Sequence, residues 1–372
     1  MSVVLSGAAV WTPPHRITNA ELVASYNAYA DRWNAEHDAD IAAGKAAAKP
    51  HSSVEFIEKA SGIKSRYAYV KDGILDVDRM RPRIPRRRED ELSHQAEMAL
   101  AAARPALAAA SKTAADIDMV IVACAYTERA YPAIAIEVQN ALGVAGFGFD
   151  MLVACSAATF AMQRAHDALA AGSARAVLVI NPELTSPQVN YCDRDSHFIF
   201  GDVATAVVME REETATARHR YRVLGAKAVT QFSNNIRSNF GYVARAEGGD
   251  PFDDARLFHQ NGRSVFKDVC PMAAAHLETQ VRDAGLTVAD VRRWWLHQAN
   301  INMNQLIVRK VLGRDATQDE APTVLDEYAN TASAGSLIAF AKHHEDLKAG
   351  DYGVICSFGA GYSIGSLLVR KL

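Results

Sequence analysis

The first candidate for chemistry is a cysteine at a strand-to-helix junction. A short apolar run ends at Cys155, and small residues then lead into a helical pattern whose recurring face holds Ala161, Ala165, Ala168 and Leu169. The N-terminus of a helix presents unpaired N–H groups and the positive end of the dipole, and both favour a thiolate. We therefore expect Cys155 to be a nucleophile with a lowered pKa, the alternative being an inert buried cysteine.

Two later stretches carry polar groups that suit thioester chemistry. Residues 294–300 read WWLHQAN and contain His297, and residues 328–336 read YANTASAGS and contain Asn330. The ordered set of Cys155, HQAN and NTASAGS resembles the β-ketoacyl-acyl-carrier-protein synthase III family of the thiolase superfamily. The resemblance covers nearly the whole chain, because it includes RITNAEL and SGI near the start, FGD in the middle and SFGAGYSIGS near the end.

The resemblance implies an α/β fold with thiolase-like αβαβα layers, built from two duplicated βαβαβ halves. We expect residues 1–212 to carry the cysteine and residues 213–372 to carry the histidine and the asparagine. The alternation of expected strands and helices favours mostly parallel sheets with helices on both faces. Relative to the family pattern, the chain has an inserted segment near 27–52, and it also has an arginine-rich loop at 79–88.

Capping and stop residues predict several helix boundaries. Thr18 or Asn19 should cap a helix, and glycines should end helices at Gly62, Gly143 and Gly313. Apolar runs predict strands at 1–10, 117–124, 174–180, 204–209, 291–296, 353–357 and 363–369.

The resemblance also implies the reaction. An acyl-CoA primer acylates Cys155, and the enolate left when malonyl-acyl carrier protein loses carbon dioxide attacks that thioester, which gives a β-ketoacyl-carrier protein at the start of fatty acid biosynthesis. His297 and Asn330 are expected to donate hydrogen bonds to the enolate oxygen. The expected oxyanion hole and site wall comprise Cys155, Phe358, Ala360 and Gly361. Ala360 departs from a family turn that often has three glycines, so it fits only where φ is not positive.

Partners follow from the same resemblance. We expect a homodimer in which Tyr131 enters the primer pocket of the partner subunit. The acidic carrier protein should bind a basic patch, with Arg309 and Lys310 as first choice. The second choice comprises Arg86, Arg87 and Arg88, although this loop could equally be a solvated surface. The CoA and carrier thioesters are substrates, and no cofactor or metal is expected. The adenine contacts of the family are altered here, where Phe56 and Ala60 occupy the matching positions.

Composition limits the alternatives. The chain has 372 residues, 49% hydrophobic and 22% charged, with a net charge of −3, which is typical of a soluble globular protein and argues against a nucleic-acid binder. No stretch has the length of a membrane span, and the N-terminus lacks the charged region of a signal peptide. The 5 cysteines form no CxxC motif, so reduced thiols in a cytoplasm are expected.

Other chemistries stay open at this point. The same fold could make a polyketide-like or dialkylresorcinol-type product, or act as a non-catalytic partner subunit. A thiolase would need Cys356 as a base, and an enzyme like HMG-CoA synthase would need Glu128 as its glutamate. A serine hydrolase is disfavoured because no GxSxG elbow occurs. His166, His197 and His259 are expected to be structural, and Gly201 and Asp202 to fix a turn rather than bind metal. The primer length is not determined.

Overall fold

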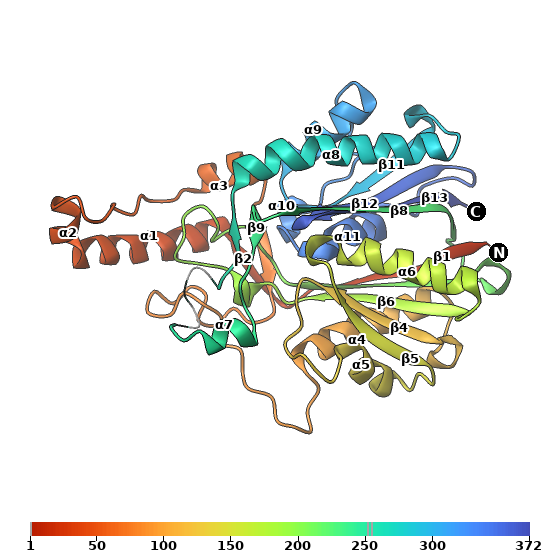
Figure 1. Cartoon of the computed structure of the whole chain (residues 1–372), viewed down its shortest axis with the longest axis horizontal. Helices are drawn as coiled ribbons and strands as arrows, with labels where there is room; N and C mark the ends of the chain where they lie inside the picture. The colour runs from red at the N-terminus through yellow and green to blue at the C-terminus, as the bar shows by residue number, and fades with distance from the viewer. Residues whose placement is uncertain (1, 251–252, 254–255) are drawn as a thin grey trace.

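Five layers of helix and sheet make up the body of the protein (Figure 1). The structure is a computed structural model that describes residues 2–250, 253 and 256–372. Helices α8 and α9 cover one outer face, α6 and α11 lie in the middle layer, and α4 and α5 cover the other outer face. This arrangement confirms the αβαβα layering expected from the sequence.

The elements have the following bounds. The helices are α1 Asn19–Glu36, α2 Asp38–Ala42, α3 Val54–Ser61, α4 His94–Ala109, α5 Ile134–Leu142, α6 Ala157–Ala171, α7 Tyr242–Ala246, α8 Gly262–Asp283, α9 Ile301–Leu312, α10 Leu325–Tyr328 and α11 Gly335–Lys342. The strands are β1 Val3–Trp11, β2 His15–Thr18, β3 Ser65–Ala68, β4 Met119–Cys124, β5 Phe147–Leu152, β6 Ala176–Glu183, β7 Val203–Arg211, β8 Tyr221–Ser233, β9 Ile236–Arg237, β10 His259–Gln260, β11 Val291–Leu296, β12 Tyr352–Gly359 and β13 Gly361–Lys371.

The main sheet is mixed rather than mostly parallel, which corrects the expectation. Its strand order is β11-β12-β13-β8-β1-β7-β6-β4-β5. Only β4–β5, β4–β6 and β11–β12 pair in parallel among the described strands of this sheet. The pairs β6–β7 and β12–β13 are antiparallel because each pair follows in sequence without an intervening α-helix. Strand β8, which the sequence analysis did not predict, joins the halves through a short pairing with β1.

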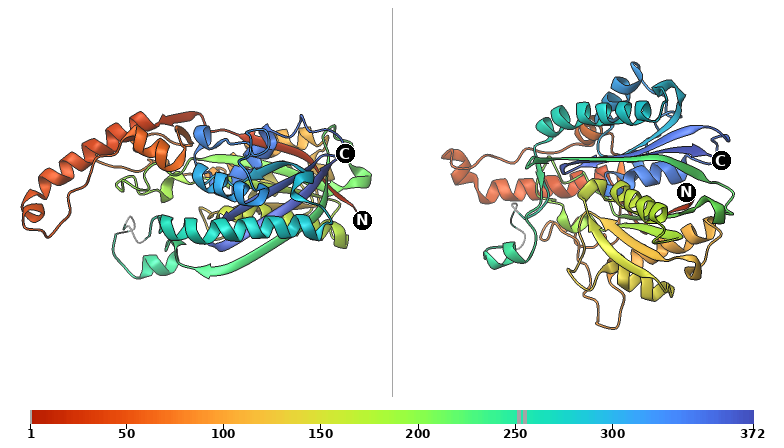
Figure 2. Two further views of the ribbon diagram at one scale, coloured as in Figure 1. Left: turned by 90° about the horizontal axis from the view of Figure 1, so that it is seen from above. Right: turned by 45° about the vertical axis from the view of Figure 1, so that its right-hand side comes forward.

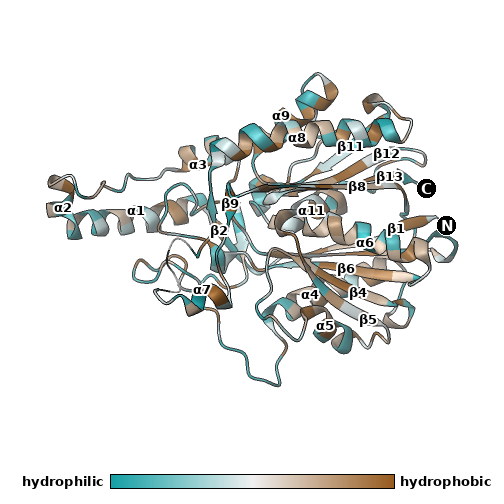
Figure 3. Ribbon diagram, viewed as in Figure 1, coloured by the Kyte–Doolittle hydropathy of each residue, from teal (hydrophilic) through white to brown (hydrophobic). Residues whose placement is uncertain are grey.

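Burial follows the predicted patterns. Strands β4, β6 and β7 are almost wholly buried, as expected for sheets covered on both faces. On α6, Ala161, Ala165 and Leu169 are buried in the core between the layers, and Ala168 packs against it. Figure 3 shows hydrophobic colour along β4 and β6, which lie between the helical layers. One hydrophobic core therefore includes the buried face of α6, the helix that begins two residues after Cys155.

Helix boundaries match the capping residues. Thr18 forms a capping box with Glu21 at the start of α1. Gly62, Gly143 and Gly313 follow α3, α5 and α9 in the left-handed conformation that ends a helix, as predicted.

The two halves share a local signature that supports the expected duplication. Thr113 and Asp116 form a capping box just before β4, and Thr287 and Asp290 form the same box just before β11. Each of these strands is followed by a helix and later by an antiparallel strand pair. The proposed boundary at residue 212 falls in the turn after β7 and stays a prediction.

The inserted segment forms an arm that projects from the body (Figure 2). Reciprocal hydrogen bonds join the helix to the returning chain: Asn34 pairs with the backbone of Lys49 at 3.0 and 2.8 Å, and Asn27 with the backbone of Ser52 at 3.1 and 2.8 Å. These hydrogen bonds stabilise the projecting part of a helix, which has few packing contacts with the body of the protein. No helix in the described ranges is both long and apolar enough to cross a membrane.

Candidate active site

Cys155 lies in a tight turn between β5 and α6. The turn is a 3₁₀ segment at Ala154–Ser156, and Ala154 has a positive φ of 44°, a strained conformation that is typical of functional sites. Gly359 at the end of β12 touches the cysteine, because a Cβ built on this glycine would lie 2.5 Å from Cys155 Cβ. The second half of the chain therefore approaches the nucleophile through a position that tolerates only glycine.

The thiol is neutral, which overturns the expectation of a lowered pKa. Burial raises the pKa of Cys155 to about 12, and the negative charge of Glu183 acts in the same direction. The backbone N–H groups of Cys155 and Ala360 hydrogen bond to the sulfur and act in the opposite direction, but they do not outweigh desolvation. A helix N-terminus lowers a thiol pKa and burial in apolar surroundings raises it, and for Cys155 burial has the larger effect.

His297 follows the last residue of β11, and a backbone hydrogen bond and a contact with an aromatic ring hold it in place. Its N–H donates to the carbonyl of Cys356 at 2.8 Å, and the ring meets Phe358 edge to face at 5.2 Å and 87°. The side chain is buried, and burial lowers its pKa to about 3. The imidazole is therefore neutral at physiological pH and can donate one proton while it accepts another.

The Asn330 amide is oriented by its own loop. Its Oδ1 accepts from the Ala332 N–H at 2.9 Å, so the amide NH₂ is left as the donor. The backbone pairs across the halves, since Asn330 N–H donates to Ile199 O at 2.9 Å. Ala329 and Ala332 have positive φ values of 60° and 46°, so strained backbone flanks this residue as it does Cys155.

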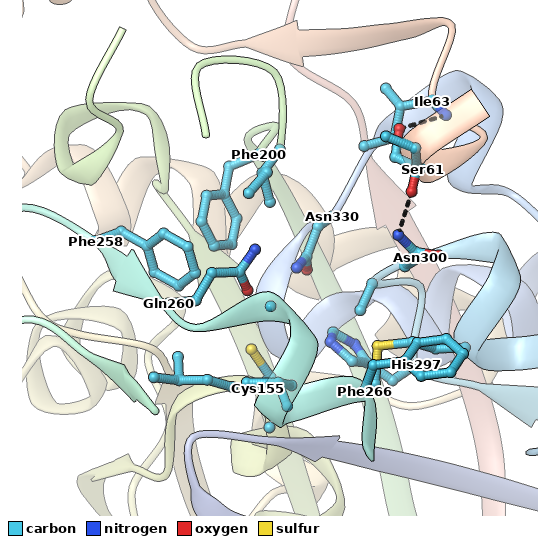
Figure 4. Close-up of a pocket in the computed structure, with 18 of the residues that line it drawn as sticks. Ser61, Ile63, Cys155, Phe200, Phe258, Gln260, Phe266, His297, Asn300 and Asn330 are labelled. Carbon is cyan, nitrogen blue, oxygen red and sulfur yellow. Dashed lines mark hydrogen bonds between the residues drawn. The ribbon is translucent and has the colours of Figure 1, made fainter. Parts of the chain in front are cut away.

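The three residues line one cavity of about 290 Å³. Figure 4 shows Cys155, His297 and Asn330 among the side chains that line this cavity. Also in the lining, Phe200 and Phe258 meet edge to face at 4.6 Å, and Phe266 and Met303 add apolar surface. An apolar channel that ends at a thiol and two neutral donors suits an acyl thioester.

The oxyanion hole expected from the sequence stays a prediction. The Ala360 N–H of the expected turn lies close enough to hydrogen bond to the Cys155 sulfur. Among the described residues, those with positive φ other than glycine are Met80, Ser111, Ala154, Ala329 and Ala332. Ala360 is thus accommodated without strain, while Gly361 has a φ of 135° that favours glycine. Phe358 forms the wall beside His297.

Some of the predicted basic residues form ion pairs with carboxylates, and others are exposed. In the arginine-rich loop, Arg87 pairs with Glu97 and Arg88 with Asp90, while Arg86 is exposed. On α9, Arg309 pairs with Asp315 at 2.5 Å and Lys310 is exposed. Tyr131 lies outside the cavity of its own chain and is 80% exposed.

The sequence analysis missed Arg194. Its guanidinium lies 3.7 Å from the centre of the ring of Phe56, which lines the cavity, and its Nε donates to the His51 carbonyl of the arm at 2.8 Å. The sequence analysis expected Gly201 and Asp202 in this polar stretch to fix a turn rather than bind metal, and it assigned no role to Arg194. Arg194 and Phe56 are 138 positions apart in the sequence, so no local sequence pattern could have predicted their contact.

Rival assignments fit the geometry poorly. Glu128 accepts from the N–H groups of His94 and Gln95 at 3.2 and 2.8 Å, so it caps α4 and does not line the cavity. Cys356 is buried in the core under α8 and α9. Asp202 accepts hydrogen bonds from the segment at Thr185 and Ser186, which confirms that it fixes a turn. Within the described residues, no group of three or more His, Cys, Asp and Glu side chains could hold a metal.

Fold and site together define a condensing enzyme of the thiolase type, and comparison with known proteins agrees. Residues 149–229 match the family described as 3-oxoacyl-[acyl-carrier-protein (ACP)] synthase III, and residues 281–371 match the C-terminal part of that family. The chain is 55% identical to a β-ketodecanoyl-[acyl-carrier-protein] synthase of Pseudomonas aeruginosa, over 93% of this chain and 99% of that protein.

More distant relatives agree. A β-ketoacyl-[acyl-carrier-protein] synthase III of Roseobacter denitrificans is 31% identical over 74% of this chain and 83% of its own. The fold of the priming β-ketosynthase from the R1128 polyketide pathway matches with a TM-score of 0.78 at 22% identity, covering 99% of this chain and 96% of that one. The chain belongs to the β-ketoacyl-[acyl-carrier-protein] synthase III family and is an acyltransferase.

Proposed function

We propose that the enzyme transfers an acyl primer from CoA to Cys155 and condenses it with malonyl-acyl carrier protein. The observation that carries this proposal is the meeting of Cys155, His297 and Asn330 on one apolar cavity. A thiol suits this task because it attacks a thioester and later leaves again. The reaction needs no cofactor.

The proposed steps follow from the protonation states. Because the thiol and the imidazole are both neutral, the thiol proton must leave as sulfur attacks, and it ends on the departing CoA thiolate. The N–H groups of Cys155 and Ala360 stabilise the oxyanion of that step. In the second step, the neutral His297 and the Asn330 NH₂ donate to the enolate oxygen while malonyl carbon dioxide leaves past Phe358. A neutral donor is favoured here because it stabilises the enolate without protonating it.

The primer is proposed to be an octanoyl group. A β-ketodecanoyl product, which the Pseudomonas relative's name states, is an octanoyl group extended by the two carbons that malonate leaves. The phenylalanine-rich channel of this chain suits such an apolar primer. We place the adenine end of CoA near Phe56 and Arg194, where an aromatic ring and a guanidinium lie together.

We further propose a cytoplasmic homodimer. Strand β5 ends the sheet order, so one of its edges is unpaired, and Phe147, Phe149 and Leu152 on it are exposed. An exposed apolar sheet edge is typical of a subunit interface. Tyr131 is exposed as well, which supports its entry into the partner's primer pocket.

Separating the half-reactions tests the proposal. With octanoyl-CoA, the intact mass of the wild-type enzyme should rise by one octanoyl group, and Cys155→Ala should show no adduct. His297→Ala and Asn330→Ala should still be acylated but should decarboxylate malonyl-carrier protein about a hundredfold more slowly, because each removes a preorganised donor. Cys192→Ala is the matched control and should behave as wild type. An adduct on Cys155→Ala, or wild-type decarboxylation by either donor variant, would contradict the assignments.

A further inference from the structure

The structure contains a buried carboxylate beside the site that the proposed mechanism does not use. Glu183 is the last residue of β6 and is 1% exposed. Its Oε2 accepts from the Ala125 N–H at 3.1 Å, at the end of β4. Its Oε1 accepts from the Ser333 N–H at 3.0 Å and from the Ser333 hydroxyl. One carboxylate therefore ties the ends of two strands of the first half to a loop of the second half.

That loop is the one that holds Asn330. Ser333 directly follows Ala332, whose N–H orients the Asn330 amide and whose φ is positive. Strained backbone persists only where its surroundings hold it. The hydrogen bonds from Ser333 to Glu183 fix the loop immediately after the strained residue, so they bear on where the Asn330 amide points.

No ion pair joins Glu183 to a Lys, Arg or His among the described residues. The titratable groups that interact with it include Cys124, Tyr126, Cys155 and Asp202, and each of these is neutral or acidic. Burial raises the pKa of Glu183 to about 7, while the hydrogen bonds from Ser333 and Ala125 act in the opposite direction. The same negative charge raises the pKa of the Cys155 thiol. A negative charge that opposes ionisation of Cys155 is unfavourable for acylation of this thiol. We therefore expect a role of Glu183 in the decarboxylation step.

We propose that Glu183 is a positioning residue for the decarboxylation step, because its carboxylate anchors the Asn330 loop against the end of β4. This inference rests on the role proposed above for Asn330. Glu183 itself is not among the residues that line the cavity.

Glu183→Gln tests this because it keeps the side-chain size, removes the charge and replaces one acceptor with a donor. Decarboxylation of malonyl-carrier protein should fall about tenfold or more, since the Ser333 and Ala125 N–H groups cannot both be satisfied. Alkylation of Cys155 by iodoacetamide at about pH 8 should become several-fold faster, because a nearby negative charge is gone. A loosened site would also expose the thiol to iodoacetamide, so the pH profile of decarboxylation is needed to separate a loss of positioning from destabilisation.

The pH profile gives a second signature. Wild-type decarboxylation should decline as the pH falls through about 7, where Glu183 gains a proton and loses acceptor capacity. Glu183→Gln should lack this decline, because the amide does not titrate in this range.

Two further variants separate the causes. Ser333→Ala removes one hydrogen bond that lowers the pKa of Glu183 but retains the carboxyl group, so it should slow decarboxylation and speed alkylation less than Glu183→Gln does. Glu210→Gln alters another buried carboxyl, which pairs with Lys112 at 2.9 Å, and should change neither rate. Wild-type decarboxylation by Glu183→Gln, or an equal loss of priming and decarboxylation, would overturn the proposal. Asn330→Ala is measured in parallel: if it is impaired and Glu183→Gln is not, the Glu183 proposal alone fails.

Discussion

At the scale of single residues, desolvation dominates the site. Cys155 has the helix N-terminus that the sequence predicts, yet its pKa is raised to about 12 and that of His297 is lowered to about 3. Both shifts favour the neutral form, so the resting site holds no thiolate–imidazolium pair. A neutral histidine is also the form that can stabilise an enolate by donation alone.

These protonation states predict an unusual pH dependence of thiol reactivity. The rate of Cys155 alkylation by iodoacetamide should rise about tenfold per pH unit from about pH 7 to about pH 10 without a plateau, whereas an ordinary cysteine levels off above ~8.5. Mass spectrometry of the Cys192→Ala protein would follow the modification at Cys155 without signal from that partly exposed thiol. A plateau near neutral pH would show that Cys155 ionises in the resting enzyme after all.

At the scale of elements, α8 and α9 pack side by side (Figure 1), and each contributes residues to the cavity lining. Lys310 on α9 is close enough to lower the pKa of the Cys270 thiol on α8, against the larger effect of burial. Lys267 is exposed on α8, one residue after Phe266 of the cavity. Because Arg309 is already paired with Asp315, Lys310 and Lys267 are better candidates for an acidic carrier protein.

Charge reversal at these lysines tests carrier binding. The double variant Lys267→Glu and Lys310→Glu should raise the KM for malonyl-carrier protein about tenfold, an effect that salt should reduce, because surface charges act at long range. Acylation of Cys155 by octanoyl-CoA should change little. Arg86→Glu in the arginine-rich loop is the matched control. A shift of similar size in the control would favour that loop as the binding surface.

At the scale of the whole molecule, the exposed edge at β5 is the main unpartnered apolar surface of the first half. We expect Phe149→Lys to produce monomers by light scattering, because a charge would be buried in the proposed interface. Phe232→Lys should stay dimeric, since Phe232 is 86% exposed on β8, at a distance from β5 in the sheet order. Monomers from Phe232→Lys, or dimers from Phe149→Lys, would place the interface elsewhere.

The same interface predicts the role of Tyr131. Tyr131→Ala should keep the dimer but shift primer preference toward longer acyl-CoAs, because each added methylene that the enlarged pocket buries contributes about 0.8 kcal/mol. The measurement is kcat/KM across acyl-CoAs of increasing length. An unchanged length profile would remove Tyr131 from the pocket.

The sequence by itself predicted many of the elements and indicated a candidate catalytic set. Caps such as Thr18, stops such as Gly143 and the buried face of α6 depend on residues within a few positions of one another, so local rules predicted them. The order of Cys155, His297 and Asn330 along the chain likewise indicated the reaction class before any geometry was known.

Tertiary structure alone decided the electrostatics and the sheet pairing. The pKa of Cys155 depends on Glu183, on the Ala360 N–H and on the protein that excludes water around it, all supplied by distant parts of the chain. The Phe56–Arg194 contact and the anchoring of the Asn330 loop by Glu183 arise in the same way. Desolvation and Coulomb interactions depend on distances in space, and sequence spacing does not determine those distances.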